Sequence, residues 1–77
     1  MFARKSLVDK AIRRRFAVTL AGNEGVFAGV LTESDSETWV FEDCETVPKS
    51  PGETPQPIVG RVFIERTSVA YLQELPR

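Results

Sequence analysis

Apolar and polar residues alternate along most of this chain, and that period of two is typical of half-buried β-strands. Segments with this pattern, or with a short apolar run of strand length, are residues 16–20, 26–31, 39–47, 58–65 and 68–72. Turn-forming residues separate them, with Gly22 and Gly25 after the first segment and Ser34 to Glu37 before the third. We therefore predict a mostly β fold in which the first two strands form a hairpin.

Residues 1–15 have a different period. Ser6 precedes Asp9 by three positions, a spacing typical of a helix N-cap followed by an acid in the first turn. Apolar residues then recur at three- and four-residue spacing, opposite the basic ones: Leu7, Val8, Ala11, Ile12 and Phe16 against Lys10, Arg13 and Arg14. The pattern predicts a basic amphipathic helix at residues 6–15, which must lie against the rest of the protein or a neighbouring molecule because a helix of about ten residues is marginal alone.

Glycine and proline positions shape the predicted sheet. Gly29 falls inside the second strand, where a residue without a side chain permits the sharp bend of a small barrel. Four of the five prolines fall within residues 48–57, which we predict to be an exposed proline-rich loop. We expect Gly29→Val to be severely destabilising and Gly52→Ala, in the loop, to be almost silent.

Composition limits how this domain can gain stability. The chain has 77 residues, enough for one core, with one cysteine and no histidine. A disulfide within the chain and a typical zinc site are therefore excluded, and self-association remains as the usual third source of stability. The sequence lacks the run of about 18 apolar residues that a membrane span needs, and it lacks the apolar stretch of a signal peptide, so we expect a cytoplasmic protein without membrane contact.

The formal net charge of −1 conceals two oppositely charged parts of the chain. Residues 1–15 carry six basic side chains and one acid, which gives +5, whereas residues 16–77 carry four basic side chains and ten acids, which gives −6. The basic part is a candidate phosphate-binding surface. Its alternatives are an ordinary solvated face, a face covered by the acidic barrel of a second copy, and, less favoured, a contact with an anionic membrane.

Motif residues recur in a specific order across the predicted strands. The hairpin reads Val18-x-Leu20, a turn, and Phe27-x-Gly29-x-Leu31-x-x-x-Asp35. Later stretches add the acidic pair Glu42-Asp43 before Cys44, and Gly60 to Ile64 followed by Ser68 to Leu72. In this order and spacing, residues 7–72 resemble the Sm-like family, which includes the LSm proteins and bacterial Hfq.

The resemblance implies a single domain, mostly β with an N-terminal α-helix, whose residues 16–75 form a five-stranded, strongly bent Sm-like (SH3-like) barrel. It also implies that the fourth and fifth strands pair with neighbouring copies and close a homo-oligomeric ring of about six or seven subunits. Such pairing removes the open strand edges that a small barrel exposes. Rings of this pared-down form are typical of viral and mobile-element proteins, and that origin is a further expectation of the resemblance.

The positions of the family's uridine pocket differ in this chain. The family places an asparagine a few positions after the aspartate, whereas Asp35 is followed here by Ser36 to Trp39, which contain no asparagine. The family's arginine-glycine pair after the fourth strand reads Glu65-Arg66. We therefore expect no intact uridine pocket.

Other candidate chemistry has little support in the sequence. The acids within residues 33–37 and 42–45 suit a hard cation, but they lack EF-hand spacing and are more typical of a solvated turn and strand end. Cys44 has no histidine to activate it, and we predict a buried structural thiol. We expect no enzymatic activity, no metal site and no cofactor.

Two functions remain as hypotheses. The leading one is a ring that binds RNA or single-stranded nucleic acid through a basic helical rim. Its predicted contacts are Lys10, Arg13, Arg14 and Arg15 for phosphates and Tyr71 for base stacking. The alternative is a structural or regulatory protein-interaction ring, in which the acidic barrel and the proline-rich loop meet a protein partner and no nucleic acid is bound. Salt-dependent binding of nucleic acid distinguishes the two.

Overall fold

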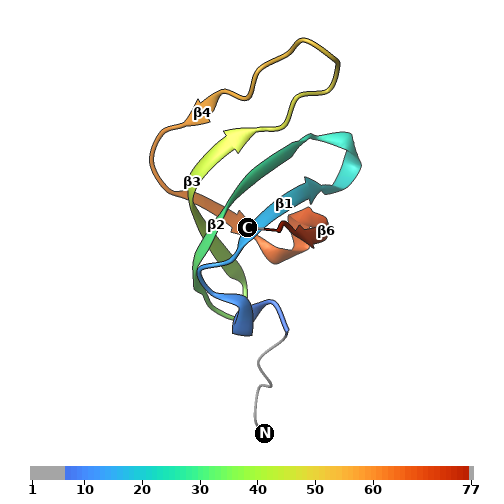
Figure 1. Ribbon diagram of the computed structural model, residues 1–77. Helices are drawn as coiled ribbons and strands as arrows, with labels where there is room; N and C mark the ends of the chain where they lie inside the picture. The colour runs from blue at the N-terminus through green and yellow to red at the C-terminus, as the bar shows by residue number, and fades with distance from the viewer. Residues whose placement is uncertain (1–6, 77) are drawn as a thin grey trace, which may run out of the picture.

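The structure is a computed structural model that describes residues 7–76 (Figure 1). Within these residues the chain forms six β-strands and three short 3-10 turns. In chain order the elements are η1 Asp9–Ala11, β1 Arg15–Leu20, η2 Ala21–Asn23, β2 Val26–Ser34, β3 Thr38–Thr46, β4 Pro57–Ile58, β5 Val62–Glu65, η3 Arg66–Ser68 and β6 Val69–Glu74. The predicted mostly β fold is confirmed.

The six strands belong to one antiparallel sheet. Their order is β4-β3-β2-β1-β6, and β5 pairs with the other half of β3. No strand pairing joins β6 to β4 or β5 within residues 7–76, so the sheet does not close. The predicted five-stranded, strongly bent barrel is therefore corrected to an open sheet of six strands.

The extra strand arises because the predicted fourth strand is split. Gly60 has a φ of 93°, which leaves the extended region and interrupts the strand between β4 and β5. β4 consequently pairs with β3 near Cys44, whereas β5 pairs with β3 from Thr38 to Phe41. Residues 48–56, between β3 and β4, lie outside the strands as an exposed loop that extends from one end of the sheet (Figure 1).

Two bulges bend the long hairpin of β2 and β3. In the first, Asp43 and Cys44 of β3 lie opposite the single residue Gly29 of β2. In the second, Thr32 is the extra residue on β2. Bulges increase local bending and twist, and both long strands curve visibly (Figure 1).

The core lies on one face of the curved sheet, called the core face below. Its buried members come from the first three strands: Phe16, Val18, Phe27, Leu31, Trp39, Phe41 and Cys44. Phe27 and Phe41 meet edge to face, with ring centroids 5.5 Å apart. The burial predicted for Cys44 is confirmed, and desolvation raises the pKa of its thiol.

The predicted helix at residues 6–15 is wrong for the described residues. The chain forms only the single turn η1, Ile12 is already extended with a ψ of 138°, and Arg13 has a positive φ of 72°. The physical reason lies in Asp9, whose carboxylate bonds to distant side chains instead of supporting a first helical turn. Ser6, the expected N-cap, lies outside the described residues. Because 3-10 turns of three residues are the only helical elements within residues 7–76, none has the length to cross a bilayer.

Candidate functional site

The turn between β2 and β3 lies against η3, and these are the two segments to which the resemblance assigns a nucleotide pocket. Asp35 Oδ1 accepts hydrogen bonds from the backbone N–H groups of Glu37 and Thr38, at 2.9 and 2.7 Å. These two bonds lower the pKa of the Asp35 carboxyl, and the Arg66 charge adds a smaller effect in the same direction. The backbone N–H of Arg66 donates to the Glu37 carbonyl oxygen at 2.9 Å, which fastens η3 to the turn.

Arg66 is at the centre of a side-chain network in this region. Its Nη2 donates to Asp9 Oδ1 at 2.7 Å, to Ser34 Oγ at 2.8 Å and to the Asp35 carbonyl oxygen. Its guanidinium carbon lies 4.7 Å from the Trp39 ring centroid. Ser34 Oγ and Trp39 Nε1 also donate to Asp9 Oδ1. We call these side chains the Arg66 network.

The Arg66 network joins segments that are far apart in the sequence. Its central ion pair is largely buried, because the side chains of Arg66 and Asp9 are only 23% and 13% exposed. A guanidinium surrounded in this way is committed to the fold and is not free to clamp a ligand. The sequence interpretation missed this role, and no local pattern around Arg66 signals it.

A polar hollow lies where the two turns meet. It is lined by Ser36, Glu37, Thr38, Glu65, Arg66 and Thr67. This hollow presents two carboxylates and no aromatic ring, and its guanidinium belongs to the Arg66 network. Such a lining disfavours a nucleotide, which needs cationic contacts for its phosphate and a flat surface for its base.

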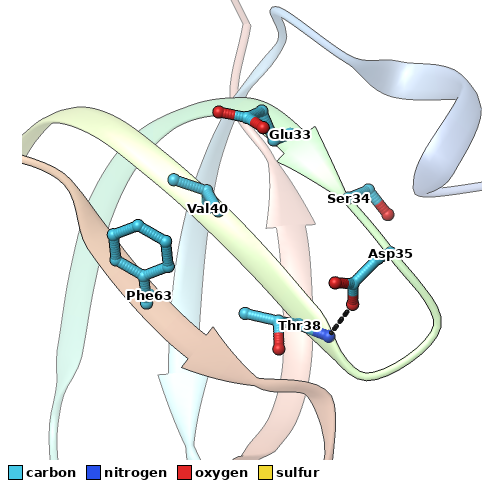
Figure 2. Close-up of a pocket in the computed structure, with 6 residues that line it drawn as sticks. All are labelled: Glu33, Ser34, Asp35, Thr38, Val40 and Phe63. Atoms are coloured by element: carbon cyan, nitrogen blue, oxygen red, sulfur yellow. Dashed lines mark hydrogen bonds between the residues drawn. The ribbon is translucent and has the colours of Figure 1, made fainter.

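A second hollow, the β5 hollow, lies on the other face of the sheet from the core, called the outer face below. It has a volume of about 240 Å³ and is lined by Glu33, Ser34, Asp35, Thr38, Val40 and Phe63 (Figure 2). Glu33, Val40 and Phe63 are cross-strand partners on β2, β3 and β5, which places them in one row. Figure 2 shows the Phe63 ring beside Val40, with the carboxylates of Glu33 and Asp35 at the rim. The β5 hollow therefore combines an apolar wall with hydrogen-bond acceptors.

Arg61 contacts two of the residues that line the β5 hollow, Phe63 and Glu33. Its guanidinium carbon lies 5.0 Å from the Phe63 ring centroid, and Nη1 lies 3.1 Å from Glu33 Oε2. The Phe63 side chain is nonetheless 60% exposed. An aromatic ring that is held in place but still open to solvent is well suited to contact a partner.

Two of the four predicted phosphate contacts are engaged in ion pairs within the chain. Arg14 Nη1 lies 3.1 Å from Glu74 Oε2. Arg15 Nη2 lies 2.6 Å from Glu45 Oε1, and Arg15 Nη1 donates to the Asp43 carbonyl oxygen at 3.2 Å. Asp43 is a residue of the first bulge and has a φ of 54°, so Arg15 stabilises a strained backbone position. Arg14 and Arg15 are therefore already paired with acids of the chain, Arg14 in an exposed pair and Arg15 in a partly buried one.

The other two predicted phosphate contacts remain exposed. Lys10 lies in η1 and Arg13 follows it, and neither forms an ion pair with any residue from 7 to 76. The backbone N–H of Arg13 donates to the Leu31 carbonyl oxygen at 2.6 Å, which fixes this residue beside β2. The basic residues thus lie on an irregular segment and not on a helical rim.

Tyr71, the predicted base-stacking residue, is separated from the basic segment. It is 61% exposed on β6 and pairs with Thr19 at the far end of β1 from Arg15. Thr19 lies four positions along the strand from Arg15, which corresponds to about 13 Å. The structure therefore does not bring Tyr71 together with the predicted phosphate contacts.

The acidic residues that the sequence offers as candidate cation ligands form no metal site within residues 7–76. No three histidine, cysteine or carboxylate side chains within residues 7–76 converge as metal ligands. The acids of residues 33–37 and 42–45 instead include members with separate basic partners, because Glu45 pairs with Arg15 and Glu33 pairs with Arg61.

No protein-family model matches this chain, and no curated protein is significantly similar to it.

Proposed function

We propose that this protein is a non-enzymatic subunit that assembles with copies of itself into a closed ring. In this ring the open edge of β5 in one copy pairs with the open edge of β6 in the next. The observation that carries the proposal is that β5 and β6 each have one edge without a strand partner within residues 7–76, and each has an exposed aromatic side chain, Phe63 on β5 and Tyr71 on β6. The assembly would be the protein's function as a structural or regulatory interaction module.

The composition of the edge strands supports this pairing. Soluble proteins usually protect an open strand edge with lysine, proline or a covering element. β4 begins with Pro57, but β5 and β6 contain neither lysine nor proline. Two unprotected edges on opposite ends of one sheet favour a head-to-tail contact, and such contacts close into rings when the rotation between copies allows it.

The Sm-like resemblance supports the same assembly from the sequence. β5 and β6 coincide with the segments that the resemblance identifies as the fourth and fifth family strands, the strands that pair between subunits. The strong curvature of β2 and β3 is compatible with the bent strands that the resemblance implies, in a sheet that stays open within the subunit. A ring of about six or seven subunits is the size that the resemblance implies.

Lysine substitutions at the edges test the ring. We expect the wild-type chain to be a monodisperse oligomer at micromolar concentration, and Phe63→Lys and Tyr71→Lys each to be monomeric, because a charged side chain would be forced into the edge contact. Size-exclusion chromatography with light scattering, together with native mass spectrometry, measures the subunit number. Both side chains are more than half exposed, so the monomeric variants should keep their fold.

Leu7→Lys is the matched control for the edge variants. Leu7 is 84% exposed and lies outside the strands, so this substitution should leave the oligomer intact. A monodisperse wild-type monomer would overturn the ring proposal. If the Leu7→Lys oligomer also dissociates, the loss of assembly in the edge variants comes from the added charge and not from the strand edges.

Binding of RNA or single-stranded nucleic acid is a second candidate function, and the exposed pair Lys10 and Arg13 is the observation that favours it. Both side chains lack an ion pair among residues 7–76, and Arg13 has a backbone conformation that glycine would adopt with less strain. Two cations per subunit form a weak phosphate site, but a ring multiplies such a site by avidity. The acidic surface of the strands opposes this function.

Glutamine substitutions distinguish the free cations from the paired ones. If nucleic acid is bound, we expect Lys10→Gln with Arg13→Gln to weaken binding of a single-stranded RNA and to reduce the salt slope by about two, one unit for each phosphate contact. Arg14→Gln with Arg15→Gln should mainly lower the melting temperature, because it breaks internal ion pairs. Fluorescence anisotropy at two salt concentrations measures the binding. No binding of the wild type at low salt would leave the protein-interaction ring as the function.

A further inference from the structure

We propose that the Tyr71 side chain of one copy packs against Phe63, at the border of the β5 hollow, in the next copy. This inference rests on the proposed ring and adds the specific contact that fixes the two edges against each other. The hollow and Tyr71 lie on different edge regions of the chain, and Tyr71 is not among the residues that line its own hollow.

The alternation of side chains on the two edge strands places the contact on one face. On β5, Val62 and Ile64 pack against the core, so Phe63 lies on the outer face. On β6, Leu72 packs against the core, so the adjacent Tyr71 also lies on the outer face. If β6 continues the sheet at the open β5 edge with the core faces aligned, Tyr71 lies on the same face as Phe63 and next to its ring, with the hollow on the β3 side of that ring.

The chemistry of the hollow matches a tyrosine. Phe63 and Val40 form the apolar wall, whereas the carboxylates of Glu33 and Asp35 at the rim accept hydrogen bonds. Tyrosine presents an apolar ring with one O–H donor at its tip, and aromatic rings pair favourably edge to face or in offset stacks. Pairing Tyr71 with Phe63 would cover two aromatic side chains that are exposed in the single subunit, where Tyr71 is 61% exposed and Phe63 is 60% exposed.

The fixed geometry of the hollow favours a side chain that packs against its border from outside. Arg61 holds Phe63 from one side and is itself held by Glu33, while Asp35 is anchored by the backbone N–H groups of Glu37 and Thr38. These contacts keep the wall and the rim in place before a partner arrives. A preformed hollow reduces the entropy lost when the contact forms.

Photocrosslinking tests the contact on the full chain. A benzoylphenylalanine probe replaces Tyr71, and irradiation is followed by denaturing electrophoresis and peptide mapping of the covalent dimer. We expect a dimer whose second chain is modified within residues 33–40 or 61–65. The reciprocal probe at Phe63 should label residues 69–74 of the second chain, and a control probe at the exposed Leu7 should label neither region.

Affinity variants supply a measurement that does not depend on the probe. We expect Tyr71→Ala to raise the protein concentration needed for assembly by about tenfold or more. Tyr71→Phe keeps the aromatic side chain and should raise this concentration by less. An oligomer whose cross-links map elsewhere would overturn the Tyr71 contact and leave the ring standing. A wild-type chain that is monomeric by native mass spectrometry would overturn both.

Discussion

Replacing Gly29 by valine is expected to abolish folding. A Cβ atom at Gly29 would lie 2.5 Å from the Sγ atom of Cys44 and 3.3 Å from the Glu42 carbonyl oxygen. Cys44 is buried in the core and the carbonyl belongs to the backbone, so neither can move without cost. Overpacking a core costs about 1–3 kcal/mol even for small insertions, and the branched valine adds two further methyl groups. A core of this size rarely supplies more than about 3–5 kcal/mol in total.

A double-mutant cycle separates the steric cause from other effects of losing glycine. Gly29→Ala should be destabilised by about 1–3 kcal/mol. Cys44→Ala removes the Sγ atom that the new Cβ would meet, so the double variant should be less destabilised than the sum of the two single variants. Urea denaturation of the wild type and the three variants measures the coupling. Additive free energies would show that Cys44 is not the obstacle and that the bend at the first bulge has another cause.

Gly52 shows that the effect of replacing a glycine depends on its backbone φ as well as on the space around it. A Cβ atom at Gly52 would meet nothing within 4 Å, but its φ is 92°. A side chain is strained at that angle, so the expectation that Gly52→Ala would be almost silent is wrong. A loss of about 1 kcal/mol is the better expectation.

The strands could be predicted where the alternation of apolar and polar residues along the chain is enough to identify them. Phe16 and Val18 are buried and alternate with the half-buried Ala17 and Thr19, as the sequence pattern requires for β1. The split of the fourth predicted strand was not predictable in the same way, because the apolar positions continue past Gly60 and only its positive φ interrupts them. A pattern of side chains does not report that backbone angle.

The N-terminal segment and its charges were not predictable because their partners are distant in the sequence. Asp9 bonds to Arg66, which is 57 positions away, and Arg14 bonds to Glu74, which is 60 positions away. A helical period and an acid in the first turn describe only neighbours within a few residues. The tertiary contacts outweighed the helix propensity of a segment too short to hold a helix by itself.

Loss of the Arg66 network is the second large effect that we expect. Arg66→Ala would remove the Arg66 charge from beside the Asp9 carboxylate, which is 13% exposed, and would remove the cation above Trp39. Breaking a buried pair from one side costs about 3–5 kcal/mol. Because Arg66 is 23% exposed and its buried Nε has no partner within the described residues, we expect a smaller loss, about 2–4 kcal/mol.

Arg61 provides a matched control for Arg66, since it forms the same two kinds of contact at the surface. Its ion pair with Glu33 joins side chains that are 51% and 63% exposed, and its guanidinium also lies over an aromatic ring. Solvent screens such a pair, so Arg61→Ala should cost less than about 1 kcal/mol. Arg66→Ala should therefore lower the melting temperature more than Arg61→Ala does. In a domain of this size each kcal/mol of lost stability corresponds to about 4–8 °C.

The fluorescence of Trp39, the single tryptophan, reports on the same network. Arg66→Ala and Asp9→Ala should each shift the emission toward longer wavelength, because water gains access to the indole, whereas Arg61→Ala should leave the spectrum unchanged. The double variant Asp9→Ala with Arg66→Ala should be little less stable than either single variant, since each change already breaks the network. Equal melting temperatures for the Arg66 and Arg61 variants would show that the N-terminal segment is held by Val8 and Ala11 against the core and not by the charges.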